Sequence, residues 1–521
     1  MCRRACLGAV IATLACVSAC AAPARVVFGS FASQANAEHW AAEVAKRTDL
    51  TVHVIPYEGA FRVTTDPLDG DALVNATSRA RDAGLDLWRA YEPPAIRSDS
   101  SAQATRAVPA LASTQTSASA AADAQPVSRG VLSPPLVQSG WDQEMDLDVG
   151  FQTRSYAHTG YDGQSQFQPS VSLSYHYRAT LSTADSITFT PFARYDAEDD
   201  DRTHADLREL YWSHVGEDSD LHVGVRQVFW GVTEFKHLVD VINQTDFVEN
   251  IDGEDRLGQP MVNLSVVRDW GIVDFFVLPY FRERTFPGED GRLRFAYPVD
   301  RDAEYERGAG KGQVDYAVRW SHRLGPLEWG IYQFEGVGRD PLLVPELRAN
   351  GAVVLRPHYD AADQTGLDAQ AVLGDWALKL EAMSRRSFGE RFNAATAGFE
   401  RTFVGALGRA DLGLVVEYMY DQRGDDAFDT ILERDVALGT RFRLNDVSDS
   451  QALLGFIWDT ETEEFLVQLE ASRRLGDSWA LFLESRIFDG ADDDPFTAAS
   501  DFKTAPFQRD DYVQLELTRF F

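Results

Sequence analysis

Residues 512–521 read Tyr512-Val513-Gln514-Leu515-Glu516-Leu517-Thr518-Arg519-Phe520-Phe521. Apolar and polar residues alternate along this segment, with Val513, Leu515 and Leu517 on one face and mostly polar neighbours on the other. Because side chains of a strand alternate between its two faces, the pattern predicts a strand with one apolar face, followed by an aromatic residue. An amphipathic edge strand of a soluble sheet would look the same, so the rest of the chain has to separate the two interpretations.

Similar alternating segments of about ten residues recur from Met145 onward. Clear examples lie at 314–321, 376–385, 412–420, 465–472 and 479–487. Trp and Tyr stand at the strand ends, as in the interfacial girdles of membrane barrels, which a soluble sandwich would not require. The pattern predicts a mainly β fold, a transmembrane antiparallel β-barrel over residues 141–521.

The connections between these segments alternate in length. Short polar turns are predicted at 181–185, 216–220, 268–271, 323–326, 374–375, 408–410, 445–450 and 476–478. Longer connections are predicted at 230–260, 284–312, 338–362 and 489–509. Short turns at the periplasmic end and long loops at the outer end are the rule for outer-membrane barrels. We predict about eighteen strands, with sixteen as the alternative because residues 351–358 are ambiguous.

A barrel of sixteen to eighteen strands encloses an aqueous lumen, whereas about eight strands fill their interior with side chains. The inward positions carry charges of both signs, which indicates a hydrated interior. Alternatively, these charges pair with one another and only keep the lumen hydrated. The predicted pore-lining residues are Arg194, Arg226, Arg319, Lys379, Glu381, Arg385, Glu400, Glu417, Glu470 and Glu484.

One region resembles a recurring porin-like barrel family of Gram-negative bacteria. It reads Leu207-Arg208-Glu209-Leu210-Tyr211, then Val225-Arg226-Gln227 and Trp230-Gly231, then Asp240-Val241-Ile242-Asn243-Gln244-Thr245-Asp246. The resemblance covers about forty residues. It implies that the loop after Trp230-Gly231 folds inward and constricts the pore. The alternative is an exposed loop.

The chain begins like an exported protein. Arg3-Arg4 is followed by an apolar stretch and then small residues, which predicts a signal peptide over residues 1–24. All four cysteines lie within this segment, so the exported chain has at most one thiol and no disulfide framework. Val17-Ser18-Ala19-Cys20 resembles a lipobox, which makes Cys20 a candidate for lipidation; cleavage by ordinary signal peptidase is the alternative.

Residues 25–91 predict a small α+β domain of order βαββαβ, with a four-stranded antiparallel sheet and two helices on one face. Val27-Phe28-Gly29-Ser30-Phe31, Asn36-Ala37 and Phe61-Arg62-Val63 resemble the SPOR domain of bacterial envelope proteins. The resemblance implies binding of peptidoglycan glycan strands on the open sheet face, through Gly29, Ser30, Phe31 and Arg62. Alternatively, Ser30 is a turn residue and Arg62 a solvated charge.

Residues 92–140 are rich in Ser, Ala, Pro, Thr and Gln, which predicts a flexible tether. Three acidic clusters, 198–201, 459–464 and 489–494, fall in predicted outer loops. Their spacing lacks the regular pattern of a calcium loop, so we expect solvated acidic surface and no metal or other cofactor.

A net charge of -32 argues against nucleic acid as a partner. No catalytic motif is evident, so we expect a protein that is not an enzyme. The patterns together favour an outer-membrane channel for small hydrophilic solutes, tethered to peptidoglycan; a non-conducting linker or adhesin is the alternative. Expected partners are glycan strands, outer-membrane lipid, lipopolysaccharide, and the barrel-assembly machinery through Phe521.

Overall fold

The computed structural model describes residues 24–31, 34–57, 60–66, 72, 75–76, 79, 88–91, 142–424, 427, 430–462, 464–489 and 504–521. The predicted signal peptide with Cys20 and the predicted tether therefore lie outside the described residues, apart from Ala24. The chain forms two compact units.

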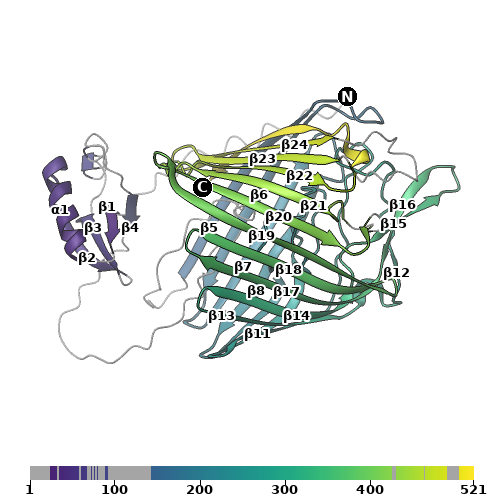
Figure 1. Cartoon of the computed structure of the whole chain (residues 1–521), viewed down its shortest axis with the longest axis horizontal. Coiled ribbons are helices and arrows are strands. Elements are labelled where there is room, and N and C mark those ends of the chain that lie inside the picture. Colours follow the sequence, from purple (N-terminus) through teal and green to yellow (C-terminus); the bar gives the residue numbers. More distant parts are fainter. Residues whose placement is uncertain are drawn as a thin grey trace. The chain divides into compact units, whose positions relative to one another are not determined.

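The larger unit is a closed antiparallel barrel of eighteen strands (Figure 1). The barrel strands are β5 (Asp142–Tyr156), β6 (Phe167–Thr180), β7 (Asp185–Asp196), β8 (His204–Val215), β9 (Ser219–Arg226), β10 (Gln259–Arg268), β11 (Gly271–Leu278), β13 (Asp315–Leu324), β14 (Leu327–Val337), β17 (Ala361–Leu373), β18 (Trp376–Ser387), β19 (Glu390–Leu407), β20 (Ala410–Asp421), β21 (Asp435–Arg443), β22 (Gln451–Asp459), β23 (Phe465–Arg474), β24 (Trp479–Asp489) and β25 (Tyr512–Phe520).

The last strand closes the barrel on the first. β25 pairs with β5 from Tyr512 opposite Tyr156 to Phe520 opposite Asp148. The predicted strand at 512–521 is thus confirmed, and the edge-strand alternative is wrong, because both of its edges are paired. Closure also explains how a sheet of this size avoids an open edge.

Eighteen strands confirm the first of the two predicted numbers. The ambiguous region, 351–358, falls on β16 (Val353–Tyr359), which joins β15 (Leu342–Leu347) and β12 (Glu304–Tyr305) in a separate three-stranded sheet. Figure 1 shows β15 and β16 at one end of the barrel, beyond its strands. This is the long-loop end, and the eight short turns lie at the opposite, short-turn end. One connection at the long-loop end is itself short, because β18 and β19 are joined through Phe388-Gly389.

The outward face of the barrel is apolar. Phe151, Leu173 and Leu515 lie on this face and are between 45% and 50% exposed. Toward the short-turn end, Trp270, Trp320 and Trp329 pack edge to face with one another in sequence. An apolar belt bordered by aromatic rings is the surface that a bilayer requires of a closed barrel. Among the described helices, none combines the length and the hydropathy needed to cross a membrane.

The smaller unit contains β1 (Ala24–Phe31), α1 (Gln34–Thr48), β2 (Val52–Tyr57), β3 (Ala60–Thr65) and β4 (Trp88–Tyr91). The strands form an antiparallel sheet in the order β2-β3-β1-β4. Val26, Phe28, Val44 and Val63 form its buried core. Most of the second predicted helix, at 69–83, lies outside the described residues, of which Ala72, Asn75, Ala76 and Arg79 are helical.

Candidate functional site: a loop inserted into the barrel

The connection between β9 and β10, residues 227–258, is the inserted loop. Residues 238–246 are all buried, which a loop on the surface of a barrel would not be. Its polar groups contact side chains of β5, β7, β18, β20 and β24, which lie on different sides of the lumen. The inward fold implied by the porin-like resemblance is therefore confirmed, and the exposed-loop alternative is wrong.

Asn243 ties the two ends of the inserted loop together. Its side-chain amide donates to the backbone oxygens of Arg226 and Leu257, both at 2.9 Å, and its carbonyl oxygen accepts from the N–H of Val228 at 2.9 Å. Beyond it, the N–H of Leu257 donates to the oxygen of Gln244 at 2.8 Å. The loop thus carries its own internal pairing and enters the lumen as an ordered unit.

Glu381 of β18 holds the first half of the loop. One carboxylate oxygen accepts from the N–H of Val232 at 2.7 Å and from the N–H and hydroxyl of Thr233 at 3.0 and 2.7 Å. The other accepts from the N–H groups of Leu238 and Val239 at 2.7 and 3.3 Å. Glu381 has no exposed surface. A buried carboxylate is tolerated because five donors replace its water shell.

Glu417 of β20 repeats this contact one step further along the loop. It accepts from the N–H groups of Glu234 and Phe235 at 2.7 and 3.0 Å. The Phe235 ring then lies over Gly439 and Gly455, where an added Cβ would come within 2.9 and 2.8 Å of it. The glycines on β21 and β22 therefore make room for the ring.

The carboxylate of Glu234 is itself paired with cations of the barrel wall. Arg441 lies 2.6 Å from it and Lys379 lies 3.8 Å from it. Both cations also contact Glu400, at 3.1 and 3.6 Å. Glu234 and Lys379 are each almost fully buried, so these charges neutralise one another inside the barrel.

Arginines on the opposite wall hold the second half of the loop. Arg194 of β7 binds both carboxylate oxygens of Glu249 through Nε, at 2.9 Å each. Arg154 of β5 donates to the backbone oxygen of Glu249 at 2.7 Å, and Arg202 donates to that of Val248 at 3.1 Å. The loop is therefore gripped by carboxylates on β18 and β20 and by guanidinium groups on β5 and β7.

Asp246 of the inserted loop also contacts cationic side chains on this side of the barrel. Arg208 lies 2.7 Å from its carboxylate and His204 lies 3.5 Å from it. Burial alone would raise the pKa of Asp246, but His204 and Arg208 hold that pKa below its usual value. The carboxylate therefore stays ionised at neutral pH.

The loop is also tied to β24 and to the long-loop end. Arg486 lies 2.7 Å from Asp252, and Asn250 donates to Glu484 at 3.2 Å. Arg339, from the connection that contains β15 and β16, donates to the backbone oxygens of Val241 and Ile242 at 3.1 Å each.

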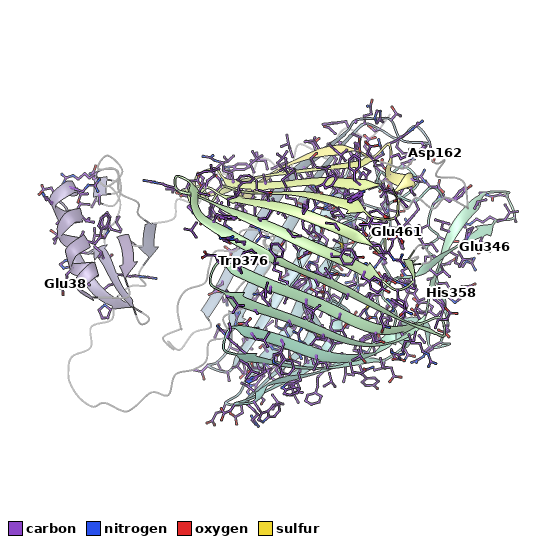
Figure 2. The ribbon with its side chains drawn as sticks, viewed as in Figure 1. Glu38, Asp162, Glu346, His358, Trp376 and Glu461 are labelled. Carbon is purple, nitrogen blue, oxygen red and sulfur yellow. The ribbon has the colours of Figure 1, made fainter. Side chains whose placement is uncertain are left out.

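The connection between β11 and β12 also contacts the inserted loop. Arg292, between β11 and β12, pairs with Asp510 at 2.6 Å and donates to the oxygens of His158 and Ser165 at 3.0 and 2.9 Å. Phe295 from the same connection stacks on Phe247 of the inserted loop, with ring centroids 6.1 Å apart. The lumen is therefore filled at two levels in this conformation. Figure 2 shows the side chains of Asp162, Glu346 and Glu461 at this end and Trp376 at the other.

The ten residues predicted to line a pore occupy inward positions, but they contact protein groups. Lys379, Glu381, Glu417, Glu484 and Arg194 bind the inserted loop, as described above. Glu400 and Glu470 contact Arg441 and Arg486, at 3.1 and 3.9 Å. The remaining three pair with neighbours: Arg226 with Asn263 at 2.9 Å, Arg319 with Asp368 at 2.8 Å, and Arg385 with Asp360 at 3.3 Å. Whether they line an open pore stays a prediction.

Several residues that hold the loop were not predicted. Arg154 and Arg441 occupy inward positions on β5 and β21, where the alternation of side chains could have identified them. Arg202 and Arg339 lie in connections, where no periodicity applies.

Two of the three acidic clusters differ in part from the prediction of solvated surface, and of the third, 489–494, only Asp489 lies within the described residues. Asp199, Asp459 and Glu464 are buried. Asp199 accepts from the N–H of Gly288 at 3.2 Å, Asp459 from that of Glu461 at 2.7 Å, and Glu464 from that of Thr504 at 2.8 Å. They are buried because they satisfy backbone donors of the loops. Within the described residues, no group of three or more His, Cys, Asp or Glu side chains is arranged to hold a metal ion.

In the smaller unit, the backbone register pairs Ser30 with Arg62, Gly29 with Val63 and Phe31 with Phe61. Val63 belongs to the core, so Arg62 lies on the other face of the sheet. The side chains of Ser30 and Phe31 lie outside the described part of the structure. Glycan binding by these residues stays a prediction.

Neither a protein-family model nor a curated protein sequence matches this chain. Solved structures similar to it include a BenF-like porin from Pseudomonas fluorescens Pf-5, with 7% identity, a TM-score of 0.42, and coverage of 74% of this chain and 98% of that one. Another is Pseudomonas aeruginosa OccK8 (OprE), with 11% identity, a TM-score of 0.42, and coverage of 73% and 98%.

A third similar structure is Escherichia coli Wzi, described as a carbohydrate-binding β-barrel of the outer membrane involved in group 1 capsule assembly. It has 9% identity and a TM-score of 0.43, with coverage of 72% of this chain and 84% of that one. At these scores the similarity does not extend to ligand or activity.

Proposed function

We propose that the protein is an outer-membrane, porin-like channel for small hydrophilic solutes, with the inserted loop controlling passage. The observation that carries the proposal is the way the lumen is filled. Its contents are held by ion pairs and charge-assisted hydrogen bonds to the wall, such as Glu381 with Thr233 and Arg194 with Glu249. A permanently closed interior would be more stable with apolar packing, since buried ion pairs contribute little net stability.

The width of the barrel supports the same proposal. Eighteen strands enclose a lumen wide enough for an aqueous channel once the loop is displaced. An anchor in the membrane needs only about eight strands.

The non-conducting linker or adhesin is the second candidate, and one observation favours it. The inserted loop and the Arg292 connection occupy the lumen at two levels. A barrel that stays closed in this way would act only through its periplasmic domain and its outer loops.

Ion conductance in planar bilayers tests the two candidates. We expect small or infrequent openings for the wild-type protein and large, sustained conductance for a variant in which residues 229–256 are replaced by a short turn. The replacement is feasible because Arg226 and Gln259 are already paired across β9 and β10. Absence of conductance from a folded, heat-modifiable deletion variant would reject the channel and favour the linker.

We also propose that the smaller unit lies in the periplasm and tethers the barrel to peptidoglycan glycan strands. The pairing of Ser30 with Arg62 on β1 and β3 supports this part of the proposal. We further propose that Phe521 is the contact for the barrel-assembly machinery and that lipopolysaccharide surrounds the long-loop end.

A further inference from the structure

Three arginines lie on the outward face of the barrel near its short-turn end: Arg401 of β19, Arg473 of β23 and Arg519 of β25. Arg401 is paired with Trp376 across the strands, Arg473 with Leu481 and Arg519 with Trp479. Directly opposed residues of neighbouring strands share a face. These arginines therefore project on the same side as the apolar residues of the belt. We name Arg401, Arg473 and Arg519 the outer arginines.

Aromatic rings hold two of the outer arginines in place. The guanidinium carbon of Arg519 lies 5.2 Å from the ring centre of Trp479 and 4.6 Å from that of Phe521. That of Arg401 lies 4.8 Å from Trp376 and 4.7 Å from Phe403. Stacking on a ring leaves the N–H groups at the edge of the guanidinium group available for another acceptor.

The outer arginines differ from the arginines inside the barrel in their lack of ion pairs. Among the described residues, no carboxylate forms an ion pair with any of the three, and the Nε of Arg401 is buried without a hydrogen bond. The carboxylate of Asp446, in the turn next to Arg473, is occupied by the N–H and hydroxyl of Ser450, both at 2.9 Å. Two other arginines at this end form ion pairs, Arg268 with Asp218 and Arg323 with Glu328, each at 3.3 Å.

The spacing of two outer arginines suits adjacent headgroups. Arg473 and Arg519 lie two strands apart, on either side of β24, where they face Leu481 and Trp479. Neighbouring strands are about 4.8 Å apart, so two strands span about 9.6 Å. A two-residue offset along the strand is about 7 Å, and the two distances at right angles place the Cα atoms roughly 12 Å apart. Long arginine side chains at this spacing can reach one phosphate together or two neighbouring phosphates.

We propose that the outer arginines bind the phosphate groups of anionic phospholipids in the leaflet at the short-turn end. Trp and Tyr girdles mark the headgroup level of a barrel, and Trp376 and Trp479 place the outer arginines at that level. Arginine binds phosphate oxygens through two parallel N–H bonds. Because the chain has a net charge of -32, the rest of its surface repels an anionic lipid, and a local group of unpaired cations is needed to retain one. This inference rests on the membrane location in the proposed function, but not on conductance.

Native mass spectrometry of the full-length protein in detergent tests the proposal, with added phosphatidylglycerol or phosphatidylcholine as the probe. We expect the wild-type protein to retain phosphatidylglycerol at least fivefold more than phosphatidylcholine. The double variant Arg473→Gln with Arg519→Gln should lose most of this preference. The matched control, Arg268→Gln with Arg323→Gln, removes the same charge from the same end and should keep it.

Equal loss of preference in both double variants would overturn the proposal, because net charge alone would explain it. So would full preference in the Arg473→Gln and Arg519→Gln variant when gel migration shows that it is folded. Displacement of the lipid by millimolar inorganic phosphate would assign the outer arginines to free phosphate. Failure of the proposed channel is distinguishable, since a folded barrel that retains the lipid without conducting ions would reject only the channel.

Discussion

Thr233 donates two hydrogen bonds to Glu381, from its N–H at 3.0 Å and from its hydroxyl at 2.7 Å, across a separation of 148 residues in the chain. Thr233 belongs to the inserted loop and Glu381 to β18, on a wall that does not adjoin the strands from which the loop departs. The contact therefore spans the lumen. It makes Glu381 the residue whose charge should matter most for holding this half of the loop.

Glu381→Gln should release the first half of the inserted loop. The amide has nearly the same shape as the carboxylate but no charge. Its NH2 group would face either the donors of Val232 and Thr233 or the donors of Leu238 and Val239. Bonds to a charged group contribute about 1.5–3 kcal/mol each, so a loss of at least about 2 kcal/mol is expected, which is more than tenfold in population. Single-channel recordings should show open probability rising by at least that factor.

Glu516→Gln is the matched control for Glu381→Gln. Glu516 is an inward carboxylate of β25 that accepts from Gln152 at 2.8 Å and from Thr518 at 3.0 Å, both residues of the barrel wall. The open probability of the Glu516→Gln variant should stay at the wild-type value. Equal effects of the two changes would mean that the loop is not held through Glu381.

Glu249→Gln should change ion selectivity as well as opening. The change removes the negative charge that pairs with Arg194. The buried cations Arg154, Arg194 and Arg202 then lack the charge of Glu249. Removing one partner of a buried ion pair costs about 3–5 kcal/mol. With the second half of the loop detached, these arginines face the lumen, so the reversal potential in a salt gradient should shift toward anions.

Glu289→Gln, at an exposed position on the connection between β11 and β12, serves as the control for this selectivity change. Its reversal potential should match that of the wild-type protein. A Glu249→Gln variant that opens without any shift toward anions would contradict the assignment of Arg154, Arg194 and Arg202 to the conducting path.

Asn243→Ala should loosen the entire inserted loop while leaving the barrel intact. It removes the partner of three buried backbone groups, those of Val228, Arg226 and Leu257. Each unsatisfied group costs about 1–3 kcal/mol. Hydrogen exchange of residues 228–258 should accelerate at least tenfold, while that of β18 and β20 stays slow. Protection of the loop equal to that of the wild-type protein would reject the role of Asn243.

The peptidoglycan proposal predicts that full-length protein in detergent sediments with purified sacculi. Arg62→Ala combined with Ser30→Ala should reduce the bound fraction several-fold, since these residues are paired on β1 and β3. Lys46→Ala, an exposed position on α1, which packs on the core face of the sheet, is a control that should bind normally. Normal sedimentation of the double variant would place the glycan site elsewhere. No sedimentation of the wild-type protein would reject the tether.

The sequence by itself determined the barrel. Alternation of side chains is a local property, so a strand such as Tyr512–Phe520 can be predicted from its own residues. Inward positions, including Glu381 and Glu417, follow from the same period. The number of connections then sets the number of strands, and their order along the chain sets the end at which each lies, because an antiparallel barrel reverses direction at each one.

Only the tertiary structure decided what occupies the lumen. Burial of Glu381 depends on donors from residues 232–239, and burial of Glu249 on Arg194, which belongs to a different strand from either end of its loop. Arg202 holds the loop from a connection, where no period marks its direction. Charge complementarity across a lumen joins residues that are far apart in the chain, so it arises only when the barrel closes and brings its opposite walls around the loop.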